Sequence, residues 1–230
     1  MAKKKIVVLS GAGISAESGI ATFRDSNGLW EGHDVMEVAS PQGWAKNQAL
    51  VLDFYNKRRK NALEAEPNEG HRVVAELEQD FEVTIITQNV DNLHERAGSS
   101  KVIHLHGSLF ESRSTADDSV YPVEGWKLEM GDCCPRGSQL RPNIVWFGEM
   151  VPMMEVALGE TLESDIFIVV GTSLVVYPAA GLVSYVPHHA PIYVVDTKIP
   201  SLPARSRLHL IQEKASTGLK RVAEELRHSK

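Results

Sequence analysis

Cysteine is scarce in this chain of 230 residues, which contains only Cys133 and Cys134. Adjacent cysteines cannot form the disulfide framework of a secreted domain, so they favour a reducing cytoplasm. Long apolar runs are also missing: the stretch 166–176 is short and broken by a glycine, whereas a membrane-spanning helix needs about 20 apolar residues. The lysines at 3–5 lead into only four apolar residues, so no signal peptide is visible. We expect a cytoplasmic protein without a membrane partner.

An excess of positive charge is absent as well. The chain has 24 Lys and Arg against 30 Asp and Glu, a formal net charge of -6. Non-specific nucleic-acid binding needs clustered positive charge, so we expect no nucleic-acid partner. The composition, 43% hydrophobic and 23% charged, is typical of a folded globular protein. The length fits a single domain, 1–230, that carries at most a small insert.

Short β-branched runs recur along the chain and predict strands at 6–9, 83–87, 102–106, 166–170 and 192–195. Helix starts are indicated at Ser40-Pro41 and at Pro67-Asn68, and the first of these helical regions ends in the basic run 57–60. A last helix is indicated by apolar residues three and four apart in 219–226. Strands that alternate with helices predict an α/β fold with a doubly wound, Rossmann-like parallel sheet.

The first predicted strand leads into a glycine-rich turn, where Gly11, Gly13 and Ala16 fit the pattern G-x-G-x-x-A. Glycines let the backbone approach a pyrophosphate closely, and a following helix offers free N–H groups to that anion. The alternative is a plain turn. In an ordinary dehydrogenase, a second strand ends in an acidic residue about 20 positions on. Residues 23–32 contain no such strand, which disfavours a simple hydride-transfer enzyme.

Residues 111–139 break the alternating pattern, because they contain few apolar side chains. A stretch of roughly 30 residues exceeds the usual loop length inside a compact domain. We interpret 111–142 as a small inserted module, which needs its own core or a metal.

Two polar segments follow predicted strands. The loop 87–91 reads Thr-Gln-Asn-Val-Asp and lies where α/β folds place ligands, although Asn89 or Asp91 capping the next helix is the alternative. His104 and His106 share one face of a predicted strand, and the pattern alone does not choose between them. A histidine suits general-base catalysis, because an unperturbed pKa of about 6.5 leaves much of it neutral in the cytoplasm.

These motifs resemble those of the sirtuins, the NAD-dependent protein lysine deacylases. The segments GAGIS, SGIATFRD and GLW, and later T-Q-N-x-D, L-H-G and G-T-S, are written here as that family writes them. The resemblance covers residues 6–226. It implies NAD as cofactor and acylated-lysine proteins or peptides as substrates.

The resemblance also implies a set of cofactor-binding residues. They are Gly11, Ala12, Gly13, Ile14, Ser15, Ala16, Thr22, Phe23, Arg24, Trp30, Gln88, Asn89, Val90, Asp91, Gly171, Thr172, Ser173, Asp196 and Ala215. Gln88 and Asn89 would contact the nicotinamide ribose, and Asp91 the carboxamide. Asp196 departs from the asparagine that many sirtuins carry there. The L-H-G motif selects His106 as general base, so His106 and Asn89 are the implied catalytic residues.

Substrate contacts are implied in two segments. Val145, Phe147, Gly148 and Glu149 lie in the segment that pairs with an extended peptide in sirtuins, although a core strand is the alternative. Tyr55 and Arg58 match the Y-x-x-R arrangement of sirtuins that remove succinyl and malonyl groups. The alternative is a solvated basic helix end.

Most sirtuins hold a structural zinc with two C-x-x-C pairs. Alignment of residues 139–142 on the G-G-x-L-R-P segment that follows the second pair puts the four ligand positions at Ser114, Asp117, Cys133 and Arg136. Structural zinc needs four thiolate or imidazole ligands, and an arginine cannot coordinate. We therefore predict no metal in the insert.

The implied reaction cleaves the nicotinamide–ribose bond of NAD and transfers the acyl group from lysine to ADP-ribose. Two alternatives remain open at this point: an NAD-dependent protein ADP-ribosyltransferase and a non-catalytic NAD sensor. Mass spectrometry of an acyl peptide incubated with NAD separates the three by a lost acyl group, a gained ADP-ribose or no change.

Overall fold

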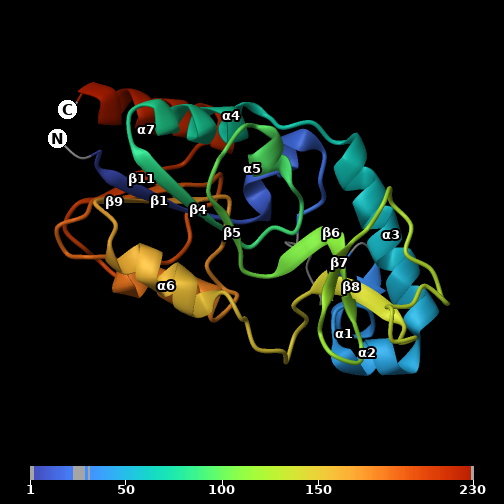
Figure 1. Cartoon of the computed structure of the whole chain (residues 1–230). Coiled ribbons are helices and arrows are strands. Elements are labelled where there is room, and N and C mark those ends of the chain that lie inside the picture. The colour runs from blue at the N-terminus through green and yellow to red at the C-terminus, as the bar shows by residue number, and fades with distance from the viewer. Residues whose placement is uncertain (1–2, 23–28, 31, 229–230) are drawn as a thin grey trace.

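The computed structural model describes residues 3–22, 29–30 and 32–228. Its main element is a sheet of six parallel strands (Figure 1). In order across the sheet, these strands are β11 (Leu208–Ile211), β10 (Ile192–Val195), β9 (Ile166–Val170), β1 (Lys5–Ser10), β4 (Glu82–Thr87) and β5 (Val102–His104). The predicted doubly wound α/β fold is confirmed.

Helices cover both faces of this sheet. On one face, Ile6 and Val8 of β1 pack with α4 (Glu69–Glu76), the short η4 (Leu77–Gln79) and α7 (Ala215–His228). On the other face, Val7 and Leu9 pack with α6 (Met154–Leu162) and the 3-10 segment η5 (Ala179–Tyr185). Because β1 is buried on both faces, its sequence is a continuous apolar run rather than an alternating one.

The order of the strands reverses at β1. The chain runs from β1 outward through β4 to β5, and later returns to β9 on the opposite side of β1. A short helix, α5 (Leu93–Arg96), lies between β4 and β5 along the chain. At such a reversal the loops diverge at the carboxyl ends of the strands and leave a crevice, which is where α/β proteins bind ligands.

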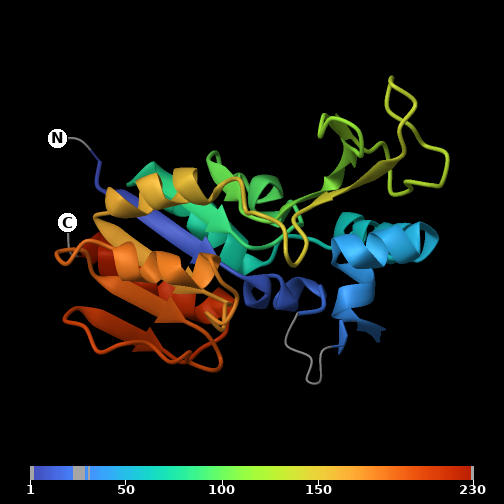
Figure 2. The ribbon, with the colours of Figure 1, turned by 90° about the horizontal axis from the view of Figure 1, so that it is seen from below.

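A smaller lobe lies beside the main sheet (Figures 1 and 2). Its helices are α1 (Val35–Val38), α2 (Pro41–Lys46) and α3 (Gln48–Glu64). Two short strands, β2 (Leu29–Trp30) and β3 (His33–Asp34), pair with each other. A three-stranded antiparallel sheet contains β7 (Val120–Pro122), β6 (Gly107–Ser114) and β8 (Leu140–Ile144), in that order. Apolar side chains from α3, β6 and β8, including Val51, Leu109 and Ile144, share one core. Leu128 and Leu140 join the segment 111–142 to this core, whereas most residues of 115–139 are exposed.

Buried polar side chains also join α3 to this sheet module. The side chain of Asn56 forms two hydrogen bonds with the backbone of Leu128, at 3.0 and 2.9 Å. Arg59 is fully buried; its Nε donates to the carbonyl of Leu109, and its Nη1 donates to the carbonyl of Trp126 at 2.8 Å. These contacts satisfy buried side-chain groups of α3 with backbone groups of the sheet module.

Three local predictions were wrong. No α-helix follows the glycine turn: the chain forms two 3-10 segments, η1 (Ala12–Ile14) and η2 (Ala16–Ser18), and then reverses at Gly19, whose φ is 84°. The strand predicted to reach residue 106 ends at 104, because 105 and 106 form a turn before Gly107 at φ 80°. The basic run 57–60 does not end a helix, since α3 continues beyond it and buries Arg59.

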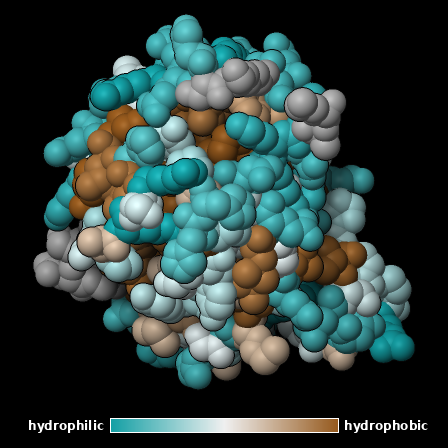
Figure 3. All heavy atoms as spheres, turned by 90° about the vertical axis from the view of Figure 1, so that its left-hand side faces the viewer, coloured by the Kyte–Doolittle hydropathy of each residue, from teal (hydrophilic) through white to brown (hydrophobic). Residues whose placement is uncertain are grey.

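The surface in Figure 3, seen from the left of Figure 1, is mainly hydrophilic, and its apolar side chains lie in separate patches. Within the described part of the chain, every helix is too short or too polar to cross a bilayer.

Candidate active site

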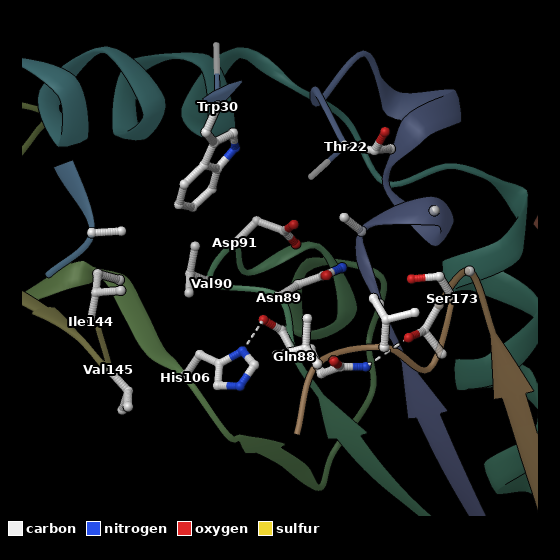
Figure 4. Close-up of a pocket in the computed structure, with 18 of the residues that line it drawn as sticks. Thr22, Trp30, Gln88, Asn89, Val90, Asp91, His106, Ile144, Val145 and Ser173 are labelled. Atoms are coloured by element: carbon white, nitrogen blue, oxygen red, sulfur yellow. Dashed lines mark hydrogen bonds between the residues drawn. The ribbon is translucent and has the colours of Figure 1, made fainter. Parts of the chain in front are cut away.

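A cavity of about 700 Å³ lies at the strand reversal and extends to the smaller lobe. The residues assigned to the cofactor that line it are Gly11, Ala12, Gly13, Thr22, Trp30, Gln88, Asn89, Val90, Asp91, Gly171, Thr172 and Ser173. The assigned general base and substrate residues also line it: His106, Tyr55, Arg58, Val145, Phe147, Gly148 and Glu149. Figure 4 shows how the turns after β4 and β9 face β8 and Trp30 across this space.

The floor of the cavity is made where the turns after β1 and β9 touch. The backbone N–H of Gly13 donates to the carbonyl of Gly171 at 2.8 Å. A Cβ on Gly13 would lie 2.6 Å from Gly171 Cα, and a Cβ on Gly11 would lie 2.7 Å from Thr172 Cβ. Only glycine permits this approach. The two turns thus present adjoining main-chain atoms to the cavity, a surface that suits the pyrophosphate of a dinucleotide.

The loop after β4 contributes amide and carboxylate groups held by hydrogen bonds. Gln88 Nε2 donates to Thr172 Oγ1 at 3.0 Å (Figure 4). Asn89 Nδ2 donates to Ser15 Oγ at 3.1 Å, and Ser15 Oγ donates to Asp91 Oδ2 at 3.0 Å. Burial raises the pKa of Asp91, although the Leu93 N–H and Ser15 hydroxyl oppose this. Ser15 therefore orients both Asn89 and Asp91.

Two buried histidines support this loop from behind, and sequence reasoning missed them. His94 Nε2 lies 3.0 Å from Ser10 Oγ, and Ser10 Oγ donates to Thr87 Oγ1 at 2.9 Å. Thr87 Oγ1 in turn accepts from the backbone N–H of Asn89 at 3.0 Å, which connects His94 to the loop. The ring of His71 packs edge-on against that of His94, with centroids 5.0 Å apart. Burial lowers the pKa of both histidines, that of His71 to about 4. In the sequence, each was a single histidine within a helical segment.

His106 is arranged as a neutral base. Its Nδ1 lies 3.0 Å from the carbonyl oxygen of Gln88 (Figure 4). Because a carbonyl only accepts hydrogen bonds, Nδ1 carries the proton and Nε2 keeps its lone pair. Burial lowers the pKa of His106, and the bond to Gln88 opposes this only in part. A neutral imidazole with a lone pair is the form that a general base needs.

His104 makes different contacts. Its Nδ1 lies 3.1 Å from the carbonyl of Asn89, and its Nε2 lies 2.6 Å from Glu95 Oε1. Burial lowers the pKa of His104, but the hydrogen bond and charge of Glu95 outweigh it, so this pKa is raised. The residues that line the cavity in the described part of the chain include His106 and not His104. Geometry therefore favours His106, which the strand pattern could not select.

Tyr55 and Arg58 both lie on the cavity side of α3. Tyr55 is fully buried and Arg58 is 8% exposed. The guanidinium of Arg58 lies 4.1 Å from the ring centroid of Trp30, a cation–π contact. Burial raises the pKa of Tyr55 to about 12, so its hydroxyl is protonated at neutral pH. These two residues are not part of a solvated helix end.

Glu149 has a structural role that the sequence did not indicate. Its carboxylate accepts from Arg141 Nη1 at 2.7 Å and Nη2 at 3.0 Å, and from the backbone N–H of Trp146 at 2.8 Å. β8 ends at Ile144, and the residues after it form a loop that this ion pair holds. Both oxygens of the Glu149 carboxylate are thus hydrogen-bonded to other groups of the protein.

Several residues that the resemblance assigns to the cofactor do not line the cavity in the described part of the chain. Ile14, Ser15, Ala16, Asp196 and Ala215 are absent from the described lining of the cavity. Ser15 and Asp196 are buried, and Asp196 Oδ1 accepts from the backbone N–H of Lys198 at 2.8 Å. The assigned residues Phe23 and Arg24 lie outside the described residues.

In the insert, the aligned ligand positions form pairs of another kind. Ser114 Oγ donates to Cys134 Sγ at 3.4 Å, and Arg136 lies 3.2 Å from Asp117 in an ion pair. Cys134, not the aligned Cys133, is buried against Ser114, and Cys133 is exposed. Among the described residues, no group of three or more His, Cys, Asp or Glu is placed to hold a metal ion.

The sequence and the fold have close counterparts in known proteins. The Sir2 family model matches residues 11–178. An NAD-dependent protein deacylase of Bacteroides thetaiotaomicron is 51% identical over 222 residues, covering 94% of this chain and 95% of that protein. A solved Sir2 homolog–NAD complex matches with a TM-score of 0.89 and 40% identity, covering 99% of this chain and 91% of that one. A Sir2–p53 peptide–NAD+ complex matches with a TM-score of 0.80 and 31% identity, covering 98% and 95%.

The family match includes the glycine turn, the loop after β4, His106, the insert and the turn after β9. The likeness in three dimensions extends over almost the whole chain. The chain therefore belongs to the Sir2 family, the sirtuins.

Proposed function

We propose that this sirtuin uses NAD to remove acyl groups from protein lysines, and that it accepts succinyl and malonyl groups as well as acetyl. The observation that carries the proposal is that Tyr55 and Arg58 line the same cavity as His106. A general base and a buried cation in one cavity suit an acyl-lysine whose far end bears a carboxylate. The relative from Bacteroides thetaiotaomicron, a deacylase by name, supports the reaction class.

The residues present fit NAD. The glycine turns offer main-chain atoms at the strand reversal, and Asp91 can accept hydrogen bonds from a carboxamide NH₂. Bound NAD would supply the ADP-ribose that receives the acyl group. Holding both reactants in one cavity can lower the barrier by several kcal/mol. In this proposal His106 accepts a proton at Nε2, and Ser15 keeps the Asn89 amide in place.

The preference for acidic acyl groups follows from the chemistry of Tyr55 and Arg58. A guanidinium offers a fork of donors to a carboxylate, and a phenol offers one more. A hydrogen bond to a charged group contributes about 1.5–3 kcal/mol, or roughly 10- to 150-fold in preference. Burial strengthens the interaction, because little water competes for the carboxylate.

The test compares succinyl-lysine and acetyl-lysine peptides of one sequence. Arg58→Met and Tyr55→Phe should raise KM for the succinyl peptide far more than KM for the acetyl peptide. Lys57→Met is the matched control, because Lys57 is a neighbouring cation on α3 that is exposed and paired with Asp53. Equal weakening of both substrates, or a wild type that never cleaves the succinyl peptide, would refute the proposed preference. Mass spectrometry that finds ADP-ribose on the peptide would favour ADP-ribosyl transfer instead.

We further propose that 1–230 is one catalytic domain whose insert, 111–142, folds without zinc. The Ser114–Cys134 and Asp117–Arg136 pairs support this, since they hold the Cys134 thiol and the Asp117 carboxylate in contacts within the protein. The cytoplasmic location stays a prediction from the scarcity of cysteine.

A further inference from the structure

Trp146 forms a hydrogen bond with the hydroxyl of Tyr55. The indole Nε1–H of Trp146 donates to Tyr55 Oη at 3.1 Å. The two rings lie 6.5 Å apart between centroids, and Trp146 is only 2% exposed. Trp146 lies between Val145 and Phe147, two residues of the segment assigned to the substrate peptide, and all three line the cavity.

This bond determines how the Tyr55 hydroxyl can act. An indole N–H is a donor only, so Oη must be the acceptor, and the hydroxyl proton of Tyr55 remains available for another partner. Burial keeps that proton in place at neutral pH, since the pKa of Tyr55 is raised to about 12. Among the described residues, the only hydrogen bond of Tyr55 Oη is the one from Trp146. The hydroxyl is therefore left as a donor.

Trp146 is itself fixed by three contacts. The guanidinium of Arg141 lies 3.3 Å from its ring centroid, and the ring of Trp44 lies 5.9 Å away. Its backbone N–H donates to Glu149, whose carboxylate is bound by Arg141 through two hydrogen bonds. A ring held in this way keeps its N–H in one direction. Arg141 and Glu149 thus act on Tyr55 through Trp146.

We propose that Trp146 is a positioning residue for the recognition of acidic acyl groups: it orients the Tyr55 hydroxyl as a donor toward the distal carboxylate of a succinyl- or malonyl-lysine. The inference rests on the proposed function. Arg58 supplies the charge, and Trp146 fills an acceptor position of Tyr55 Oη, so that the hydroxyl proton is directed to the carboxylate. The acetyl group has no distal carboxylate, so its cleavage does not use this arrangement.

The experiment removes the N–H of Trp146 and keeps an aromatic side chain at this position. Trp146→Phe keeps an aromatic ring, and 3-benzothienylalanine at position 146 keeps the shape of the indole if the Phe variant does not fold. The ratio of KM for the succinyl peptide to KM for the acetyl peptide should rise about 3- to 10-fold, the effect of one net hydrogen bond. Trp44→Phe is the control for aromatic packing, because it keeps a ring against Trp146 and leaves the Trp146 Nε1–H bond to Tyr55 Oη in place.

A double variant separates positioning from general packing. In a Tyr55→Phe background, Trp146→Phe should cause no further loss of succinyl preference, because its effect passes through the missing hydroxyl. Additive losses, or equal losses for both peptides, would overturn the inference while the proposed preference stands. A wild type that cleaves the acetyl peptide and not the succinyl peptide would overturn the proposed preference, and this inference with it.

Discussion

His106 Nδ1 lies 3.0 Å from the backbone carbonyl oxygen of Gln88, a residue of the loop that also lines the cavity. Two residues earlier in the chain, His104 makes the equivalent contact with the carbonyl of Asn89. Consecutive carbonyls of one loop therefore hold both histidines. The two imidazoles differ in what their other nitrogen faces, which is the cavity for His106 and Glu95 for His104.

The first prediction concerns these two histidines. His106→Ala should lower kcat/KM for deacylation by about 100-fold or more, the usual contribution of a general base, while the Kd for NAD stays unchanged. His104→Ala should retain most of the activity, because its Glu95 contact lies away from the cavity. Steady-state kinetics and calorimetric NAD titration measure both quantities. Wild-type turnover by the His106 variant would show that the base is another residue.

The second prediction concerns stability in acid. Burial lowers the pKa of His71 to about 4, so above pH 6.5 this histidine is neutral in both the folded and the unfolded chain. As the pH falls from 6.5 to 4, the unfolded chain takes up a proton that the folded chain excludes. The free energy of unfolding should therefore fall by about 3 kcal/mol from this residue across that window.

Urea unfolding between pH 8 and pH 4.5 checks the effect of His71. The His71→Gln variant should show a weaker dependence on pH, whereas His188→Gln, a change at an exposed histidine, should leave the dependence as in the wild type. An unaltered slope in His71→Gln would mean that other groups cause the acid sensitivity.

The third prediction concerns the glycine turns. Gly13→Ala should destabilise the protein and weaken NAD binding, because the new Cβ would lie 2.6 Å from Gly171 Cα and push the two turns apart. Gly159→Ala is the matched control: Gly159 lies in α6 with no atom within 4 Å of an added Cβ, and alanine favours a helix by up to about 1 kcal/mol. Thermal unfolding and NAD titration of both variants make the comparison. Equal behaviour of the two would show that the close approach is not required.

The fourth prediction concerns metal. The purified protein should contain no stoichiometric zinc and should keep its activity after treatment with a chelator, because Asp117 is paired with Arg136 and Ser114 with Cys134. Elemental analysis by mass spectrometry gives the zinc content. One zinc per chain, together with activity lost to the chelator and restored by zinc, would contradict the prediction.

The main sheet could be predicted because its strands are strongly apolar. β1, β4, β9 and β10 are buried along nearly their whole length, so each reads as a run of β-branched residues. β11 was not predicted, because this four-residue edge strand is partly exposed and its residue Leu210 is 55% exposed. Burial on both faces is what makes a strand visible in one sequence.

Side-chain networks could not be predicted, because they join residues far apart in the chain. Ser15 was assigned to the cofactor from its place in a motif, whereas its hydroxyl is used by Asn89 and Asp91. Glu149 was assigned to the substrate, whereas Arg141 and Trp146 occupy its carboxylate. A motif indicates which residue types gather at a site, and only the fold shows which of them face the cavity.

The burial of Arg59 has a consequence for how this sequence can change. Arg59 follows Arg58 directly on α3, yet its side chain donates to the carbonyls of Leu109 and Trp126 beneath the sheet of β6, β7 and β8. A change in the module that displaces either carbonyl would move Arg59, and with it the turn of α3 that carries Tyr55 and Arg58. Under the proposed function, mutations at such positions would then alter which acyl groups are cleaved. The proposed acyl selectivity would in this way depend on how the sheet packs against α3, and not only on Tyr55 and Arg58 themselves.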